Sequence, residues 1–232
     1  MIDEDALRGA LLRVRELVDA ACVVSGRPPG SAEIVIAGKY AAPTESQALV
    51  RAGARVIGEN RLQDLIAKQE AIADSVMFDF IGHLQTRKVR DVLPRVRLID
   101  SVVRLPLIEE IARRATGRTR VLLQVNVARE ESKAGFDPVD LDRALDTAAR
   151  SGVTVGGFMA LPPVTRDPEA SRPWFDRVRE LRDRLAGSWS GEHDLRDLSL
   201  GTSQDFVVAV EAGATMVRIG RGIVEHTRME QP

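Results

Sequence analysis

The sequence predicts a closed barrel of eight parallel strands, each followed by a helix, and three observations support this fold class. Short apolar runs alternate with helical patterns along the chain, which is typical of a parallel sheet with helical crossovers. Several of these runs are β-branched without polar alternation, as expected of strands buried on both faces. A count of about eight strand–helix units suits a (β/α)8 barrel of roughly 250 residues, and the chain has 232. An open, doubly wound sheet is the alternative.

The predicted elements follow one another in a regular order. Residues 4–24 carry leucine and valine at helical spacing, so we expect an extra N-terminal helix before the first strand. The predicted strands are residues 33–37, 55–57, 77–81, 97–99, 121–126, 154–158, 197–200 and 216–219. The helices between them include residues 45–52, 62–73, 105–115, 141–149, 173–185 and 205–212. No linker or low-complexity tract interrupts this order, so residues 1–232 are expected to form one domain.

Charge and cysteine content argue against several classes of function. The net charge is -1 and the pI is about 6.4, which gives no electrostatic reason to expect nucleic acid or an anionic membrane as a partner. The one cysteine, Cys22, cannot form an internal disulfide and is expected to be buried among apolar neighbours. The acidic start lacks the features of a secretion signal, and no apolar run is long enough to cross a bilayer. We therefore expect a cytoplasmic protein.

Lys39 is the most informative residue because lysine occurs at only four positions, 39, 68, 88 and 133. The largely apolar residues 34–38 lead into it, so we expect its amine to emerge from a buried strand at the end of the barrel where catalytic and binding groups gather. Desolvation there would disfavour the charged form of the amine and make it a better nucleophile. The alternative is a lysine that extends from the rim of the barrel into water.

The last two predicted strands are followed by residues suited to phosphate. Ser199, Gly201 and Ser203 follow the seventh strand, and Gly220 follows the eighth. Loops at these positions commonly form the phosphate site of a barrel, although the same residues can act only as caps and turns. Arg218 ends the eighth strand, where a buried guanidinium needs either a carboxylate in a salt bridge or a ligand as its acceptor.

The histidines do not have the spacing of metal ligands. His83, His193 and His226 are far apart, so no metal site is predicted. His83 could line the site, whereas His193 and His226 are expected at the surface. Trp174 begins an amphipathic helix and is expected to face the core. A P-loop and a dinucleotide-binding glycine motif are absent, which argues against a nucleoside triphosphate or NAD as the main ligand.

Seven short motifs occur in order along the chain, roughly from residue 33 to residue 223. They are residues 37–39 (AGK), 56–60 (VIGEN), 80–88 (FIGHLQTRK), 131–135 (ESKAG), 157–160 (GFMA), 198–205 (LSLGTSQD) and 217–220 (VRIG). Together they resemble the YggS/PROSC family of pyridoxal phosphate homeostasis proteins. Any one motif is weak evidence, but the complete set in this order is specific.

The resemblance implies a barrel like the N-terminal domain of alanine racemase, with pyridoxal 5′-phosphate held as a Schiff base on Lys39. It further implies that Arg218 faces the pyridine nitrogen. The other implied contacts are Asn60, His83 and Met159 beside the ring, and Ser199, Gly201, Ser203, Gly220 and the backbone of Arg221 at the phosphate.

The chain departs from the family pattern at several positions. Gly38 stands where the family usually has Ser or Thr before the lysine, and Thr202 replaces the Met of its G-M-S-x-D motif. Arg221 replaces the usual Thr or Ser, which removes a hydroxyl contact to phosphate, although its backbone N–H and its charge could substitute. Val224 and Glu225 replace the usual Phe-Gly. These departures indicate a divergent branch that keeps the site.

The function implied by the resemblance is the buffering or delivery of pyridoxal phosphate without established turnover, with apo forms of pyridoxal-phosphate enzymes as partners. We expect a monomer. An arginine beside the pyridine nitrogen disfavours its protonation and so makes the ring a poorer electron sink. One alternative is a pyridoxal-phosphate-dependent racemase or lyase that uses Tyr40 or His83 to transfer a proton. The others are an aldolase or phosphosugar barrel without the cofactor, and an interaction protein with a vestigial site. Lys133 is expected to be a solvated loop residue rather than a second cofactor lysine.

Overall fold

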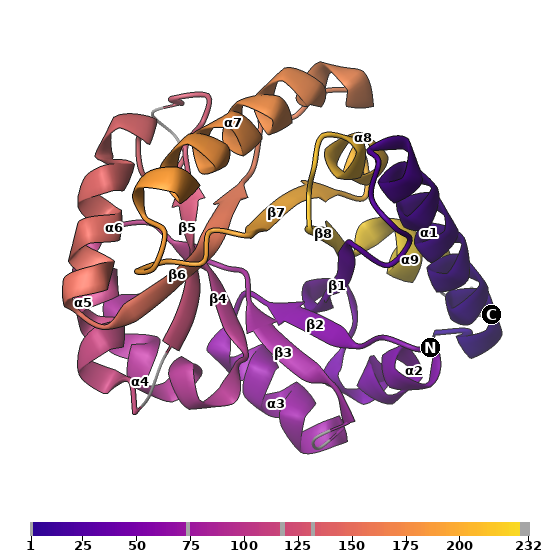
Figure 1. Ribbon diagram of the computed structural model, residues 1–232. Helices are drawn as coiled ribbons and strands as arrows, with labels where there is room; N and C mark the ends of the chain where they lie inside the picture. The colour runs from indigo at the N-terminus through magenta and orange to yellow at the C-terminus, as the bar shows by residue number, and fades with distance from the viewer. Residues whose placement is uncertain (1, 73–74, 117–118, 131–132, 228–232) are drawn as a thin grey trace.

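Eight parallel strands form a closed barrel that helices surround on the outside (Figure 1). The computed structural model describes residues 2–72, 75–116, 119–130 and 133–227. Each strand pairs in parallel with the next one in the chain, and β8 (Met216–Ile219) pairs with β1 (Glu33–Ala37) to close the ring. The (β/α)8 barrel predicted from the sequence is therefore confirmed, and the alternative of an open sheet is wrong.

The strands agree with their predicted bounds to different extents. β1 and β8 begin and end where predicted, whereas the fourth and seventh strands run further toward their carboxyl ends. Asp100 therefore lies inside a strand and not in the loop after it, and Ser199 lies well before the end of β7. A polar residue interrupts an apolar run in the sequence, yet a strand tolerates it where it faces the barrel interior and finds a partner. The other strands are β2 (Val56–Glu59), β3 (Met77–Phe80), β4 (Leu98–Val102), β5 (Thr119–Val125), β6 (Val153–Ala160) and β7 (Asp197–Thr202).

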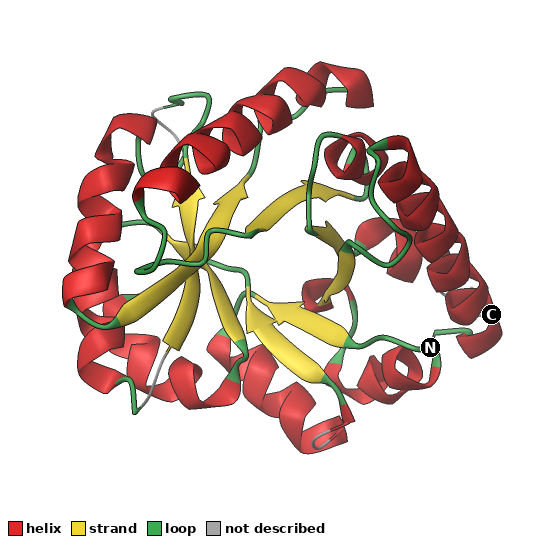
Figure 2. Ribbon diagram, viewed as in Figure 1, coloured by secondary structure: helices red, strands yellow, loops and turns green. Residues whose placement is uncertain are grey.

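The helices form an outer ring around the strands (Figure 2). The extra N-terminal helix, α1 (Glu4–Val24), is present as predicted and packs beside α8 (Phe206–Glu211). Asp3 caps α1 because its carboxylate accepts hydrogen bonds from two backbone N–H groups of the first turn, each at 3.0 Å. The remaining helices are α2 (Ser46–Arg51), α3 (Leu62–Ile72), α4 (Val89–Val92), α5 (Leu105–Arg114), α6 (Leu141–Arg150), α7 (Arg172–Ser188) and α9 (Arg221–Val224). Within the described residues, none of the helices has the length and apolar character needed to cross a membrane.

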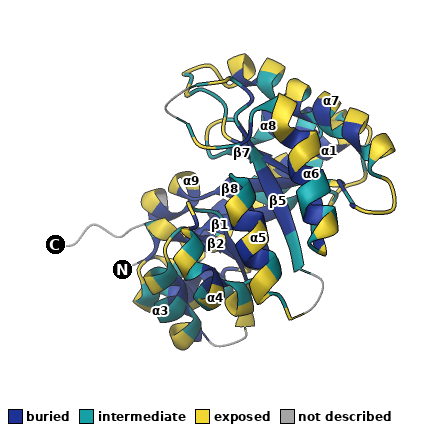
Figure 3. Cartoon of the chain, turned by 90° about the vertical axis from the view of Figure 1, so that its left-hand side faces the viewer, coloured by how far each residue is buried: buried dark blue, intermediate teal, exposed yellow. Residues whose placement is uncertain are grey.

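The core has two parts. A large apolar cluster joins the strands to the inward faces of the helices, and Figure 3 shows the strands buried while the outer faces of the helices are exposed. Cys22 is buried in this cluster and Trp174 packs against it, as predicted. A smaller, separate cluster comes from β4, β5, β6 and β8 and fills part of the barrel interior. Its members are Leu98, Leu122, Met159 and Met216.

The prediction that His193 lies at the surface is wrong. Its side chain is buried, its Nδ1 accepts a hydrogen bond from the backbone N–H of Val155 (3.3 Å), and its Nε2 lies 2.8 Å from the carbonyl oxygen of Leu145. The loop before β7 packs across β6 and carries the ring inward, so His193 joins two elements of the fold. The side chain of His226 lies outside the described residues.

Ion pairs close the amino-terminal end of the barrel, which we call the closed end. Arg97, directly before β4, donates two hydrogen bonds to Glu33 (2.9 and 2.7 Å) and two to Asp79 (3.0 and 2.7 Å). Burial raises the pKa of Asp79, and the hydrogen bonds from Arg97 oppose this shift. The other ion pairs at this end join Arg120 to Asp194 and to Asp197.

Candidate functional site

A cavity of about 450 Å³ opens at the opposite, carboxyl end of the strands. This volume lies in the range of roughly 300–1,000 Å³ that is typical of small-molecule sites. The cavity is also lined by Leu161 and Val164 from the loop after β6, where the sequence shows no motif that would mark a site. Of the predicted site residues, those that line the cavity are Lys39, Asn60, Met159, Ser203, Arg218, Gly220 and Arg221.

Lys39 lies in a single 3-10 turn, Gly38–Tyr40, that follows β1 directly. Its ammonium group lies 4.9 Å from the centroid of the Tyr40 ring, and both residues line the cavity. The residue is exposed, so the expectation of a desolvated amine is wrong. Although β1 ends at Ala37 as predicted, Lys39 leaves from the turn after it, at the open mouth and not from the buried strand. Lys39 nevertheless shares the cavity with Arg218, as predicted.

Beneath this turn lies a buried ion pair that the sequence analysis did not identify. Lys68 on α3 and Glu59 at the end of β2 are 1% and 0% exposed, and their charged atoms are 2.6 Å apart. Lys68 also donates a hydrogen bond to the carbonyl oxygen of Gly38 (3.0 Å), so the pair holds the turn that carries Lys39. Burial raises the pKa of Glu59, and the hydrogen bond from Lys68 opposes this.

The spacing of Lys68 contained a signal for this buried position. Leu65, Lys68 and Ile72 are three and four residues apart, so they share one face of α3, and all three are buried. A lysine on the apolar face of a helix needs a partner inside the protein. That partner, Glu59, comes from another element, and the sequence alone does not indicate it.

The buried pair also explains why glycine precedes Lys39 in this chain. A Cβ atom at Gly38 would lie 1.9 Å from Glu59 Oε1, which is far inside van der Waals contact. Serine or threonine, the usual residues of the family at this position, would therefore displace the Glu59 carboxylate. With Glu59 and Lys68 packed as they are, the structure leaves no room for a side chain at position 38.

Hydrogen-bond donors converge where β7 and β8 end. The backbone N–H groups of Gly220 and Gly222 both point to the hydroxyl oxygen of Ser203, at 3.2 and 3.3 Å. A Cβ atom at Gly220 would lie 2.3 Å from the Tyr40 ring, so this close approach requires glycine. The Ser203 oxygen accepts from both N–H groups, so its own hydroxyl proton remains available to donate to an anionic oxygen of a ligand.

Arg218 lines the cavity from β8 although it is 6% exposed. Its NH1 donates to the carbonyl oxygen of Ser199 (2.7 Å) and to the hydroxyl oxygen of Ser199 (2.6 Å), and its NH2 donates to the carbonyl oxygen of Ala160 (3.1 Å). Burial lowers the pKa of Arg218, and the negative charge of Asp100 opposes this shift. Among the described residues no carboxylate forms an ion pair with Arg218, so the alternative of an inter-loop salt bridge finds no partner.

Three of the predicted site residues lie outside the cavity. Ser199, predicted at the phosphate, is fully buried, faces the barrel interior and donates a hydrogen bond to Asp100 (2.9 Å), so it does not line the cavity. Gly201 has a φ of 82° and a Cβ there would lie 2.5 Å from that of Ala209, so it serves packing. His83 is exposed in the loop after β3 and does not line the cavity.

Asn60 and Met159 line the cavity as predicted. Met159 is buried and belongs to the interior apolar cluster, so it can present an apolar surface to a ring. The Oδ1 atom of Asn60 is buried and makes no hydrogen bond within the described residues. A buried polar atom without a partner at the wall of a cavity is suited to bind a polar group of a ligand.

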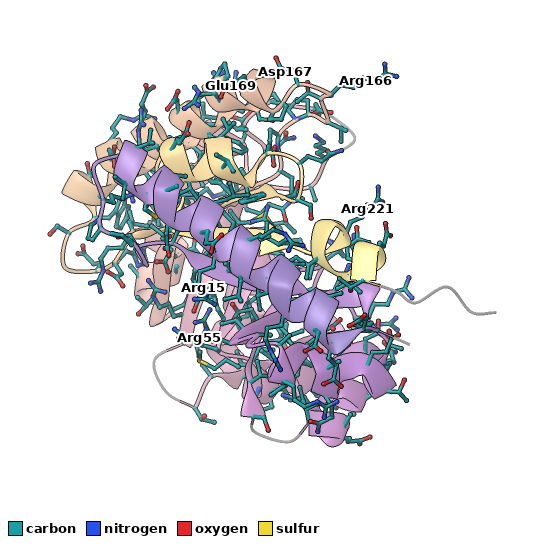
Figure 4. The ribbon with its side chains drawn as sticks, turned by 90° about the vertical axis from the view of Figure 1, so that its right-hand side faces the viewer. Arg15, Arg55, Arg166, Asp167, Glu169 and Arg221 are labelled. Atoms are coloured by element: carbon teal, nitrogen blue, oxygen red, sulfur yellow. The ribbon has the colours of Figure 1, made fainter. Side chains whose placement is uncertain are left out.

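Arg221 stands at the outer edge of the cavity. Its guanidinium lies 5.9 Å from the centroid of the Tyr40 ring and 3.6 Å from Glu225 of the same short helix, and its side chain is 66% exposed. In Figure 4, Arg221 and Arg166 project from the same side of the molecule, and Arg166 comes from the loop after β6 that also lines the cavity. The departure at Arg221 therefore places an exposed positive charge at the edge of the cavity that Ser203 and Gly220 also line.

Lys133 is neither a solvated residue nor a member of the cavity. Its ammonium donates to the carbonyl oxygens of Pro162 (3.0 Å) and Leu161 (3.4 Å) and pairs with Glu130 (2.8 Å). It therefore ties the loop after β5 to the loop after β6, and the expectation that it is free in solvent is wrong. Glu131 and Ser132 of the same motif lie outside the described residues.

The fold and the position of this site define the class of protein. The chain matches the family model of the alanine racemase N-terminal domain over residues 37–227. It is 40% identical over 215 residues to the pyridoxal phosphate homeostasis protein of Aquifex aeolicus, which covers 90% of this chain and 93% of that protein. The chain belongs to the pyridoxal phosphate homeostasis protein family, as the sequence motifs indicated.

Solved structures agree with this assignment. PipY of Synechococcus elongatus, determined with PLP bound, is 27% identical and has a TM-score of 0.80, with 94% of this chain and 99% of PipY covered. Alanine racemase of Clostridium difficile has a TM-score of 0.74 at 13% identity, and the match covers 96% of this chain but 57% of the racemase. The second likeness shows that the two proteins share the barrel fold.

Proposed function

We propose that the cavity at the carboxyl end of the barrel holds pyridoxal 5′-phosphate, with Lys39 as its covalent anchor. The observation that carries this proposal is the meeting of three kinds of group around one cavity. They are the Lys39 amine, the guanidinium of Arg218, and the donors at Ser203, Gly220 and Gly222. Pyridoxal phosphate has an aldehyde for the amine, a pyridine ring for the guanidinium and a phosphate for the hydrogen-bond donors. The names of the relatives from Aquifex and Synechococcus support the same ligand.

Each group has a separate task in this proposal. The Lys39 amine adds to the aldehyde carbon and one water leaves as the imine, a Schiff base, forms, and hydrolysis reverses the step. Arg218 presents its guanidinium to the pyridine nitrogen, while Asn60 and Met159 contact the ring. Ser203 and the backbone N–H groups near it bind the phosphate, and the charge of Arg221 adds to this attraction.

We propose carriage of the cofactor and not turnover. A guanidinium beside the pyridine nitrogen disfavours protonation of that nitrogen, and an unprotonated ring stabilises a neighbouring carbanion less well. The exposure of Lys39 at an open mouth also leaves the imine accessible to water or to an acceptor. The homeostasis name of the relative from Aquifex supports this role.

The setting proposed for this carrier follows the sequence-based expectations. We propose that residues 1–232 act as one cofactor-binding domain and as a monomer. The single cysteine, Cys22, is buried and needs no disulfide partner, which suits the cytoplasm. Apo forms of pyridoxal-phosphate enzymes are the proposed recipients.

Borohydride reduction followed by peptide mass mapping tests the proposal. Borohydride reduces an imine to a stable amine, so the cofactor mass is expected on the peptide that contains Lys39. Lys39→Ala should lose this label and the visible absorbance of the bound cofactor, whereas Lys88→Ala, outside the cavity, should keep both. A label on Lys133, or wild-type protein that gains no visible absorbance with pyridoxal phosphate, would contradict the proposal.

A racemase or lyase is the second candidate because Tyr40 lies in the cavity beside Lys39. Its phenol could transfer a proton on one face of a bound amino acid. A turnover assay with D- and L-amino acids decides between the two functions. Sustained product formation that disappears in Tyr40→Phe, while the Lys39 label remains, would replace carriage by catalysis.

A further inference from the structure

A buried carboxyl group lies in the barrel interior below the cavity. Asp100 is 0% exposed in β4, two residues after Leu98, so the two side chains point to the same face of the strand. Leu98 belongs to the interior apolar cluster, which places Asp100 inside the barrel on the side of the cavity. A buried carboxylate needs compensation because transfer of a charge from water is costly. Its Oδ1 atom makes no hydrogen bond within the described residues.

Ser199 connects this carboxyl group to Arg218. The Ser199 hydroxyl donates its proton to Asp100 Oδ2 (2.9 Å) and accepts a hydrogen bond from Arg218 NH1 (2.6 Å). A hydroxyl has one proton, so its donation to Asp100 leaves the lone pairs of the oxygen directed at Arg218. An ionised Asp100 therefore fixes the orientation of Ser199, and Ser199 in turn fixes the guanidinium.

The same arrangement balances charge without a direct contact. Within the described part of the chain Arg218 has no ion pair, and its hydrogen-bond acceptors are neutral oxygens of Ser199 and Ala160. The hydrogen bonds of Ser199 connect Arg218 to the carboxylate of Asp100. Because Asp100 does not occupy the guanidinium itself, Arg218 can still present N–H groups to the cavity that it lines.

We infer that Asp100 is a positioning residue of the cofactor site, which acts through Ser199 to orient Arg218 and to supply its countercharge. This inference rests on the proposed function of the cavity. On this inference, Asp100 in the barrel interior determines how strongly Arg218 opposes protonation of the pyridine nitrogen. With Asp100 ionised the positive field at the ring is partly compensated, and with Asp100 neutral the full field acts.

The groups around Asp100 support a response near neutral pH. Burial, together with the charge of Asp79 on β3, raises the pKa of Asp100 to about 7. Arg218 on β8, Ser199 on β7 and Arg97 before β4 oppose the shift. The charge opposite Arg218 therefore changes with a single proton in the physiological range. The visible absorbance of the bound cofactor, which depends on its protonation, is expected to follow that change.

Two matched variants of the full chain test this inference. Asp100→Asn removes the carboxylate below the cavity, and Glu110→Gln removes a buried carboxylate of α5 outside the cavity. After loading with pyridoxal phosphate, the absorbance is followed from about pH 5 to about pH 9, and the dissociation constant is measured. Asp100→Asn should shift the pH profile and raise the dissociation constant about tenfold through the weakened Arg218 contact. Glu110→Gln should change neither, because Glu110 does not act on the pKa of Asp100 and does not line the cavity.

Ser199→Ala separates positioning from a merely structural role. It interrupts the chain of hydrogen bonds while Asp100 remains, so it should shift the pH profile as Asp100→Asn does. In the double variant the two effects on the dissociation constant should not add, since both act through one path. If Asp100→Asn does not fold, Ser199→Ala alone still tests whether Asp100 acts through Ser199.

Three results would overturn the inference while the proposed function stands. They are a pH profile of Asp100→Asn equal to that of Glu110→Gln, a Ser199→Ala variant that binds the cofactor like wild type, or full additivity in the double variant. Failure of the proposed function has a different signature, because wild-type protein would then carry no borohydride-stable label on Lys39.

Discussion

The two ends of the barrel contain cavities of similar volume, about 430 Å³ at the closed end and about 450 Å³ at the mouth, and arginine lines both. They differ in what the cations contact. At the closed end Arg97 and Arg120 each bind two carboxylates of the chain. At the mouth, within the described residues, Arg218 contacts neutral oxygens and Lys39 lies beside the Tyr40 ring, and neither forms an ion pair.

This difference shows how the same residue types come to serve different tasks. A cation whose carboxylate partners belong to the chain stabilises the fold, because removal of either partner leaves a buried charge uncompensated. A cation that the fold leaves without a carboxylate can pair with an anionic ligand. Volume alone does not separate the two cavities, whereas the partners of their charged groups do.

The largest expected effect is at the closed end. Arg97→Met leaves the fully buried Asp79 without its partner and should reduce the free energy of unfolding by about 3–5 kcal/mol. Urea denaturation measures the loss. Arg90→Met is the matched control, because Arg90 lines the same cavity at the closed end but its side chain is 66% exposed beside Asp91. The control should change stability by less than about 1 kcal/mol, and equal losses in the two variants would refute the contrast between the arginines.

A second effect concerns pH and the carboxyl group below the mouth. The pKa of Asp100 in the folded protein is about 7, above its ordinary value of 3.8. Its contribution to stability is therefore fully present below about pH 4 and is lost as pH rises through about 7. Asp100→Asn lacks this contribution, so the stability of wild type relative to the variant should fall by roughly 2–4 kcal/mol across that range. Urea titrations at several pH values measure it, and a constant difference would disprove the shift.

A third test addresses the turn that carries Lys39. Gly38→Ala introduces a Cβ atom 1.9 Å from Glu59 Oε1 and should cost about 1–3 kcal/mol of stability through the displaced ion pair. Gly187→Ala is the control, since no atom lies within 4 Å of a Cβ there and the residue is in α7. Alanine in a helix should leave stability unchanged or raise it by up to about 1 kcal/mol. Thermal unfolding compares the two, and an unaffected Gly38→Ala would show that Glu59 can move aside freely.

The smallest effect on stability is expected at the rim of the mouth. Arg221→Gln removes an exposed cation whose neighbour Glu225 lies 3.6 Å away, so stability should change by less than about 0.5 kcal/mol. Retention of pyridoxal phosphate should nevertheless weaken about threefold, because an anion-binding charge is lost. Dialysis of the loaded protein measures retention. A variant that loses stability but keeps the cofactor would reverse the roles assigned to the two ends.

The sequence predicted the parts of the site that depend on neighbouring residues. Lys39 was found because it follows an apolar strand, and Gly220 because it follows Arg218 at the end of another. Such positions need no knowledge of the rest of the chain, since parallel strands place their carboxyl ends at one rim. Ser199 and His83, which were also predicted at the site, do not line the cavity, for a related reason. A polar residue near a strand end can face the rim, the solvent or the barrel interior, and strand spacing does not distinguish these.

The sequence by itself determined the barrel, the order of its strands and the rim on which Lys39 and Arg218 meet, because apolar periodicity and chain direction are local properties. Only the tertiary structure decided which charged groups are paired. Asp100 and Ser199 are 99 residues apart in the chain, and Lys68 and Gly38 are 30 apart. Closure of the barrel brings such groups within hydrogen-bond distance, and burial then makes each unpaired charge costly enough to select its partner.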